Sequence, residues 1–595
     1  MIGISLRKEK SSMRYLLIVL VAFSGIGEAK RLETPAESEK LLRTPDAATT
    51  FAFIDRLDAA SDRIAQHAFG STPEGRPLKV VIAGEALPDR EIVFVQAGIH
   101  GGEIEGKDAG LILLAEIAAG EKRALRWLDH ATLVFVPILN LDGHERRSKF
   151  NRINQDGPVE MGWRATSQRL NLNRDYIKAD APEMRALLRL INQWNPDILI
   201  DSHTTNGADY QYDLTWSMDD DVTQHPRLRA WQAEALTGRV QKQLERQGHL
   251  IAPYIELNDG TDPMKGFTNF GAGPRYSTGY AVARGRVGLL LETHMLKPYP
   301  DRVHATYDVI TAILDDIAAH PGALRAATRQ VDADMVARAA DPNASYPIRL
   351  VNAGVAEDYA FKGFEWTVTQ SDVSGDNWIR YDPRKPKTFT VPFFREVKIA
   401  QAVAPPAAYL IPAQWTGVIE RLRLHGVRLL RIDHDVRVSA DVSRLSNPQY
   451  ATASFEGRVA IATFAHARER REMPLRAGDW LVPMNQPLAN IALHVLEPDA
   501  PDSALRWGDF NSIFEQREYA DARVAEQLAR DMMAKDAALK TAFETKLAAE
   551  PEFAKNPYAR LNWFVQQSDW REWDLGLYPV LRLDIAAVKA LQPGS

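Results

Sequence analysis

The sequence predicts an α/β fold: a mixed, largely parallel β-sheet flanked by helices, followed by a β-rich part and a helical C-terminal segment. Two observations support this fold class. Between residues 50 and 318, apolar runs of strand length alternate with longer helical stretches, the pattern of a sheet covered by helices. After residue 345, short segments alternate in the two-residue period of half-buried strands. At 595 residues the chain is too long for one core, so we expect two or three domains.

The first part contains strand-like runs separated by helical stretches. Its central runs are continuously apolar, as expected for strands that are buried on both faces. We expect strands at residues 78–83, 92–97, 132–137, 197–201 and 288–291. We expect helices at residues 106–119, 181–193 and 226–247. In such sheets, ligands bind beyond the carboxyl ends of the strands.

The later part of the chain divides into two further units. We expect a first domain over residues 50–325, a β-rich accessory domain over 345–515 and a helical segment over 516–595. Residues 364–368 and 388–391 alternate as strands do. Residues 517–567 are rich in Ala, Lys, Glu and Arg, which favour helices.

Composition excludes several classes of function. The formal net charge is −6, so there is no basic excess to hold nucleic acid, and we expect no nucleic-acid partner. Cysteine is absent from the sequence, which excludes cysteine nucleophiles, disulfides and thiolate metal sites. A metal site must therefore use His, Asp and Glu, which suits a catalytic zinc with an open position. We interpret the acidic run Asp219-Asp220-Asp221 as a solvated loop.

The N-terminus has the pattern of an export signal. Four basic residues, Arg7, Lys8, Lys10 and Arg14, precede an apolar run at 15–23, and Gly27-Glu28-Ala29 offers small residues for cleavage. We therefore predict a signal peptide over residues 1–29 and an exported protein, periplasmic or secreted, with no integral membrane span after its removal. The alternatives are an uncleaved anchor, or a start codon assigned upstream of Met13.

The polar residues that carry chemistry follow three of the predicted strands. His100 and Glu103 come directly after the strand at 92–97, three residues apart at the opening of a helix, so they can turn to one side. His203 follows the strand at 197–201, and Glu292 follows the strand at 288–291. Two His and one Glu match the ligand set of a catalytic zinc with water in the fourth position. Glu292 would then serve as the general base.

The sequence resembles the carboxypeptidase A-like zinc carboxypeptidases of peptidase family M14 over about residues 50–320. The resemblance rests on six segments in order: 70–78, 100–103, 162–164, 171–174, His203 and 291–293. It implies a zinc carboxypeptidase-like fold for the first domain, with one Zn²⁺ per chain held by His100, Glu103 and His203. It further implies that Arg164 stabilises the oxyanion, and that Asn173 and Arg174 grip the terminal carboxylate of a peptide substrate. A mobile tyrosine covers the substrate in this family.

The sequence departs from the family at two points. The family typically has an aspartate two residues before the Asn of the Asn-Arg pair, where this chain has Asn171. An amide oxygen can still accept the imidazole N–H of His100, but without a charge it would make that histidine less basic. The covering tyrosine does not align cleanly; Tyr276 is the best candidate, and Tyr280 is the second although its place ahead of a strand favours core packing. His294 and His144 follow strands too, and a structural role is favoured for each.

These features predict a zinc-dependent metallocarboxypeptidase that removes a C-terminal residue from a peptide with a free carboxylate. The alternative is a related zinc amide hydrolase that acts on cell-wall peptides or as a deacylase, because such enzymes share the metal ligands. A binding protein on an inactive hydrolase scaffold is a third possibility, which the presence of all three ligands and the base disfavours. The part after residue 345 resembles extensions of bacterial members of the family.

Overall fold

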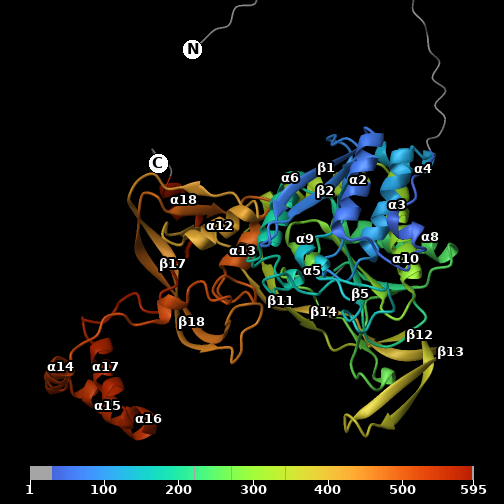
Figure 1. The fold of residues 1–595 in the computed structure, drawn as a ribbon. Helices are drawn as coiled ribbons and strands as arrows, with labels where there is room; N and C mark the ends of the chain where they lie inside the picture. The colour runs from blue at the N-terminus through green and yellow to red at the C-terminus, as the bar shows by residue number, and fades with distance from the viewer. Residues whose placement is uncertain (1–29, 220, 270, 342, 592–595) are drawn as a thin grey trace, which may run out of the picture.

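The computed structural model describes residues 30–591 apart from positions 220, 270 and 342. The predicted signal peptide therefore lies outside the described residues. A large β-sheet with helices on both faces forms the first part of the chain, and a second sheet with its own helices lies beside it (Figure 1). Among the residues that the structure describes, no helix combines the length and apolar character that crossing a membrane requires.

The first sheet has eight strands in the order β1-β2-β4-β3-β5-β10-β6-β7. Its centre is parallel, since β4, β3, β5 and β10 run in one direction, whereas β1, β2 and β6 join by antiparallel pairing. This confirms the mixed, largely parallel sheet. In chain order the strands are β1 (Ile64–Ser71), β2 (Pro77–Ala83), β3 (Glu91–Gln96), β4 (Ala131–Val136), β5 (Ile198–Thr205), β6 (Leu214–Ser217), β7 (Ile251–Pro253) and β10 (Val287–His294).

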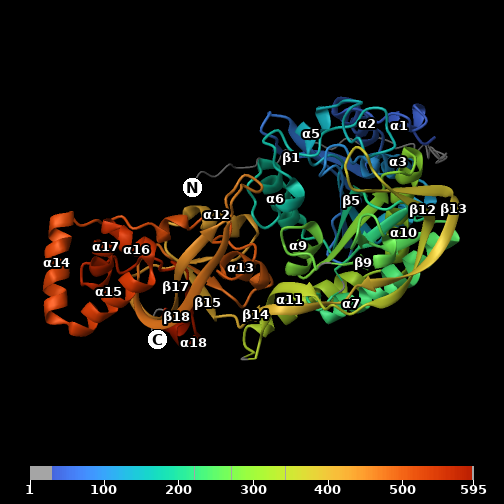
Figure 2. The same cartoon turned by 90° about the horizontal axis from the view of Figure 1, so that it is seen from below.

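The two faces of this sheet are covered by different helices. Helices α3 (Glu105–Ala119) and α10 (Tyr299–Ala319) pack against each other on one face, with α2 (Ala47–Ala60) beside them. Helices α6 (Pro182–Trp194) and α9 (Ser277–Ala283) lie on the side that faces the C-terminal part (Figure 2). Because both faces are covered, every residue of β3, β4 and β5 is buried, which explains the apolar runs within these strands.

Three expected elements differ in extent from the prediction. Strand β5 continues to Thr205 and β10 to His294, so His203 and Glu292 lie inside strands and not just past their ends. Backbone pairing with a neighbour determines where a strand ends, and β5 and β10 pair over their full length despite polar side chains. The helix expected at 226–247 is divided into α7 (Pro226–Trp231), a π-helical stretch η2 (Gln232–Val240) and α8 (Gln241–Arg246).

Residues 346–403 are attached to the first sheet region. Strands β11 (Tyr346–Asn352) and β14 (Val397–Val403) pair with each other. Strands β12 (Glu357–Gln370) and β13 (Asn377–Phe394) form a long hairpin. The end of β13 pairs with β9 (Phe267–Thr268), which itself pairs with β8 (Glu256–Leu257).

A second, six-stranded sheet follows, in the order β16-β19-β15-β20-β17-β18. In chain order its strands are β15 (Ala408–Ile411), β16 (Leu430–Arg431), β17 (Val436–Tyr450), β18 (Ile461–Leu475), β19 (Trp480–Pro483) and β20 (Leu581–Leu583). Helices α12 (Thr416–Leu424) and α13 (Ala489–Leu496) pack between this sheet and α6 and α9 of the first part. One continuous apolar core includes buried residues of both parts, so the two sheets are packed together and not merely linked.

The C-terminal segment is helical only in part. Helices α14 to α17 form a unit with a small aromatic core of its own, apart from the first sheet (Figure 1). They are Ala522–Lys535, Ala537–Ala549, Pro551–Lys555 and Pro557–Gln567. After them the chain returns to the second sheet, where β20 and the short helix α18 (Ile585–Ala590) are placed. The expected helical segment at 516–595 therefore also contributes a strand, β20, to the second sheet. The boundaries of the expected domains stay predictions.

Candidate metal centre

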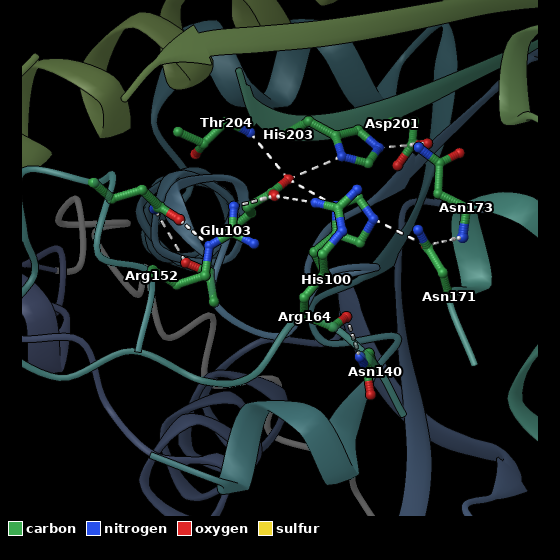
Figure 3. A network of polar contacts seen from close by, with 12 residues as sticks. His100, Glu103, Asn140, Arg152, Arg164, Asn171, Asn173, Asp201, His203 and Thr204 are labelled. Carbon is green, nitrogen blue, oxygen red and sulfur yellow. Dashed lines mark hydrogen bonds and ion pairs between the residues drawn. The ribbon is translucent and has the colours of Figure 1, made fainter. Parts of the chain in front are cut away.

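Three buried side chains converge where β3 and β5 meet α3. His100 and Glu103 lie on the turn between β3 and α3, and His203 lies on the adjacent strand β5. Glu103 Oε2 is 3.0 Å from His100 Nδ1 and 3.0 Å from His203 Nδ1 (Figure 3). One ligand atom from each residue lies within 4.8 Å of the others. Two imidazole nitrogens and one carboxylate oxygen around a common point are the donor set that a catalytic zinc uses.

The other ring nitrogen of each histidine, Nε2, contacts a side-chain oxygen. His100 Nε2 is 3.0 Å from Asn171 Oδ1, and His203 Nε2 is 3.0 Å from Asp201 Oδ2 (Figure 3). These contacts turn the Nδ1 atom of both rings toward Glu103. The amide partner of His100 is the one expected from the sequence. Asp201 was not singled out, although its spacing of two residues from His203 on a strand places both side chains on one face.

Burial and charge set the protonation of the cluster. Burial lowers the pKa of His100 to about 4, which favours the neutral, metal-binding imidazole. Burial opposes ionisation of Glu103, but its interactions with His100 and Arg152 hold the pKa of this carboxyl well below its usual value. The Glu103 carboxylate also accepts the backbone N–H of Thr204 at 3.1 Å.

The glycines of the His100–Glu103 turn are required by a neighbouring loop. A Cβ on Gly101 would lie 2.4 Å from the backbone nitrogen of His144, and a Cβ on Gly162 would lie 2.3 Å from the carbonyl oxygen of Gly101. The turn therefore packs backbone to backbone against the loop that carries Arg164. The close approach of the two backbones therefore leaves no space for a side chain at Gly101 or Gly162.

Glu292 lies beside His203 on the adjacent strand. The two residues are register partners in the parallel pairing of β10 with β5, so their side chains share a face. Glu292 is 9 % exposed, and its Oε2 has no hydrogen-bond partner among the residues that the structure describes. Burial raises the pKa of Glu292 to about 8. A buried carboxyl with a pKa near neutrality can both accept and release a proton.

Two arginines approach the cluster from its open side. Arg164 Nη1 is 3.3 Å from Glu103 Oε1 and 3.4 Å from His100 Nδ1. Arg152 also donates to Glu103 Oε1 (Figure 3). Arg164 was expected here on the family resemblance. Arg152 was not, because it lies in the irregular segment between β4 and α6, where no local pattern indicates which side chains turn inward.

A cavity of about 610 Å³ opens over the cluster and holds the other predicted residues. Asn173, Arg174 and Tyr276 line it together with the metal cluster, Glu292 and Arg164. The Arg174 guanidinium lies over the Tyr276 ring at 4.6 Å from its centre. The side-chain oxygen of Asn173 is buried without a hydrogen-bond partner among the described residues. The cavity thus presents cationic and amide groups together with the three potential metal ligands.

Three other side chains that the sequence raised lie elsewhere. Tyr280 is buried in the core, where its hydroxyl is 3.0 Å from His425 Nδ1. His294 Nε2 contacts the carbonyl oxygen of Ala208 at 2.8 Å, and His144 Nδ1 contacts Glu145 at 2.8 Å. None of these three is among the residues that line the cavity.

The acidic run at 219–221 is not a solvated loop throughout. Asp219 is only 9 % exposed and lines the cavity, which corrects the interpretation made from the sequence. Asp221 accepts hydrogen bonds from the backbone and hydroxyl of Thr223. Asp220 lies outside the described residues. Asp219 follows β6, which pairs antiparallel with β10, the strand that carries Glu292. The local sequence does not indicate this pairing, so it does not predict that Asp219 lies at the cavity.

Comparison with known proteins agrees with this geometry. Residues 50–304 match the sequence model of the zinc carboxypeptidase family, Peptidase_M14. Carboxypeptidase 2 of Trichophyton rubrum is 23% identical over 487 residues, which cover 77% of this chain and 83% of the relative. Carboxypeptidase D of Mus musculus is 28% identical over 156 residues, 21% of this chain and 11% of that protein. The crystal structure of a metallo-carboxypeptidase from Burkholderia cenocepacia has 18% identity and a TM-score of 0.36, covering 46% of this chain and 69% of that one.

The family model and the curated relatives indicate one class for residues 50–304: this segment is similar to metallopeptidases, which are hydrolases. More narrowly, the segment matches the zinc carboxypeptidases of family M14.

Proposed function

We propose that this protein is a zinc-dependent carboxypeptidase that hydrolyses the C-terminal peptide bond of a substrate with a free carboxylate. One observation supports the proposal: three side chains that could hold a metal ion, a buried carboxyl and an arginine all line a single cavity. The metal cluster consists of His100, Glu103 and His203, and the other two groups are Glu292 and Arg174.

One Zn²⁺ per chain would be held by His100, Glu103 and His203. The fit is supported by the donor set itself and by the oxygens behind both histidines, which orient each Nδ1 toward the common point. When bound, the zinc would polarise the scissile carbonyl and lower the pKa of the attacking water.

Glu292 would take the proton of the attacking water and pass it to the leaving amine. Its raised pKa, about 8, suits both transfers near neutral pH. Arg164 reaches the cluster from the cavity side, so its guanidinium would lie where negative charge develops on the carbonyl oxygen. Removing such a donor typically costs about 100-fold or more in kcat.

Asn173, Arg174 and Tyr276 would bind the terminal residue of the substrate. A planar guanidinium can hold a carboxylate through two parallel hydrogen bonds, and the half-buried amide of Asn173 adds donors beside it. The Tyr276 ring under the Arg174 guanidinium restricts that side chain to the cavity wall.

The buried Asp219 suggests a preference for a basic terminal residue. Glu103 and Glu292 have assigned roles, and Asp219 is the remaining carboxylate among the described residues that line the cavity. An opposite charge in a desolvated pocket favours Lys or Arg in the departing residue. We expect peptides ending in Arg to be cleaved faster than those ending in Phe. In Asp219→Asn, this preference for Arg over Phe should be lost. The same order in the variant would refute a role for Asp219.

The predicted signal at residues 1–29 supports export to the periplasm or medium, and residues 50–325 would form the catalytic domain. Cleavage of a signal can be checked by N-terminal sequencing of protein recovered from the periplasm or the culture medium. An N-terminus at residue 1 would contradict it.

The base is tested by Glu292→Gln. We expect kcat to fall by about 100-fold to 10,000-fold, while zinc content stays at one per chain. Glu183→Gln is a matched control, because Glu183 is also a buried carboxyl whose pKa burial raises, to about 7, but it lies outside the cavity. Full turnover in Glu292→Gln, or an equal loss in the control, contradicts the assignment.

The exopeptidase activity is tested with paired substrates. Peptides with a free C-terminal carboxylate should be cleaved, and their amidated forms should be at least about 100-fold poorer, since Arg174 would lose its partner. Arg174→Ala should reduce the difference in cleavage rate between the free-carboxylate and amidated peptides, because it should raise KM for the free-carboxylate peptide. Equal rates on both forms of the peptide favour the alternative amide hydrolase.

A further inference from the structure

The loop between β17 and β18 reaches from the second sheet back to the metal centre. Glu456 Oε2, on this loop, accepts the backbone N–H of Asn171 at 2.8 Å. Asn171 is the residue whose side-chain oxygen contacts His100. The loop packs closely here, since a Cβ on Gly457 would lie 3.2 Å from the side chain of Leu170. A residue 285 positions later in the chain thus holds the backbone behind a metal-binding histidine.

The Asn171 side chain carries more than one contact. Its Oδ1 is 3.0 Å from His100 Nε2 and also accepts the backbone N–H of Asn173 at 3.0 Å. Asn171 therefore connects the His100 ring to the short 3₁₀ turn η1 (Leu172–Arg174), which carries Asn173 and Arg174. Displacement of its backbone would move both the metal-binding ring and the carboxylate-binding pair.

The base of the loop is fixed by paired charges. Arg458 binds Asp180 through two contacts of 2.7 Å and binds Asp509 at 2.9 Å. Arg421 on α12 contacts the same Asp509 at 3.1 Å. These ion pairs join the two parts of the chain beside Glu456, which limits the freedom of the loop and allows a single hydrogen bond to determine position.

The segment that carries Tyr276, next to Arg174, has a similar contact. Asp502 binds Arg275, the residue before Tyr276, at 2.7 and 2.8 Å. Trp507 lies under the same guanidinium at 5.4 Å and stacks on Phe455 of the β17–β18 loop. The second sheet region therefore contacts both segments that would bind the substrate's terminal residue.

We propose that Glu456 is a positioning residue for the metal centre: by accepting the Asn171 N–H, it holds the turn that orients His100 and presents Asn173 and Arg174. The proposal rests on the proposed function for the role of Arg174, but its effect on metal binding does not depend on catalysis. In this proposal, the part of the chain after residue 404 helps to position the residues of the metal centre.

The test compares Glu456→Ala with Glu456→Gln, and with Glu472→Ala as the control. Gln retains an oxygen that can accept the Asn171 N–H, whereas Ala does not. Glu472 is exposed on β18 of the same hairpin. Zinc transfer to a chelator is measured for each purified full-length protein, followed by kcat and KM on a free-carboxylate peptide. Circular dichroism confirms that each variant is folded.

Glu456→Ala should lose zinc about three- to tenfold faster than wild type. This is at or below the roughly 10- to 100-fold effect of losing an outer partner itself, because Glu456 acts through Asn171. KM should rise by a similar factor with a smaller change in kcat, because substrate anchoring is affected more than the base. Glu456→Gln should recover most of both effects, and Glu472→Ala should match wild type.

The proposal is overturned if Glu456→Ala keeps wild-type zinc release and KM, or if Glu456→Gln is as impaired as Glu456→Ala. Should the wild type bind zinc but cleave no peptide, the proposed function fails, and zinc release still decides the role of Glu456. If Glu456→Ala alone misfolds, the test uses Glu456→Gln. Zinc release from this variant at the wild-type rate supports the role of the acceptor oxygen, and impaired zinc retention overturns it.

Discussion

The outer partners of His100 and His203, the two proposed zinc-binding histidines, differ in charge, and exchanging that charge should change zinc affinity in opposite directions. His203 is backed by the carboxylate of Asp201, whereas His100 is backed by the amide of Asn171, each at 3.0 Å. Asp201→Asn removes a charge behind one ligand, and Asn171→Asp adds one behind the other. Both substitutions keep an oxygen in place and nearly the same volume, so the change is chiefly electrostatic.

The magnitude follows from burial. Asp201 is 0 % exposed, so its charge is poorly screened, and a charge-assisted contact is about twice as strong as a neutral one. Loss of an outer partner typically costs about 10- to 100-fold in metal affinity, and the retained oxygen places Asp201→Asn near tenfold, about 1.4 kcal/mol. Asn171 is half-buried, so solvent screens the added charge, and we expect about a threefold gain in affinity.

The assay is competition for zinc between each protein and a chelator of known affinity at pH 7.5. Affinity should fall in Asp201→Asn and rise in Asn171→Asp, with the double variant near wild type. Changes in the same direction, or changes below about twofold in Asp201→Asn, would refute the view that these partners act through ligand basicity.

Three further outcomes are expected. Gly101→Ala should lower the free energy of unfolding by about 1–3 kcal/mol in urea titrations, because its Cβ would lie 2.4 Å from the His144 nitrogen; a wild-type midpoint would contradict this. The hydrogen bonds of His249 to Asp213 and Asp308 raise its pKa to about 9, above its unfolded value of about 6.5. Its stabilisation is therefore complete below about pH 6.5 and lost as pH rises through 9, so His249→Asn should cost about 1–2 kcal/mol at pH 6 and little at pH 10. An equal cost at both pH values would count against the ion pairs. Finally, a chelator should lower the Tm and added zinc restore it, by about 2.7 kcal/mol of stabilisation at 100 times the Kd; an unchanged Tm would show that no metal was bound.

Much of the fold could be predicted because its signals are local. The buried strands β2, β3, β4, β5 and β10 all coincide with apolar runs, since a strand covered on both faces needs apolar side chains throughout. The carboxyl-terminal parts of β5 and β10 were missed, because Ser202, His203 and Thr204 are polar and only pairing with the neighbouring strand keeps them extended. The contribution of β20 to the second sheet was missed for a related reason: it is three residues long and follows a helical unit.

By itself, the sequence determined the residues that converge at the metal centre. His100 and Glu103 are close because three residues separate them, and His203 and Glu292 join them because adjacent parallel strands end at one edge of the sheet. Only the tertiary structure decided what surrounds these groups: Arg152 against Glu103, Asp219 in the cavity, and Glu456 on the backbone of Asn171. Such contacts join irregular segments far apart in the chain, and no periodicity encodes them. The contact of Glu456 depends in addition on how the two packed parts meet, which is a property of the whole core and not of any local run of residues.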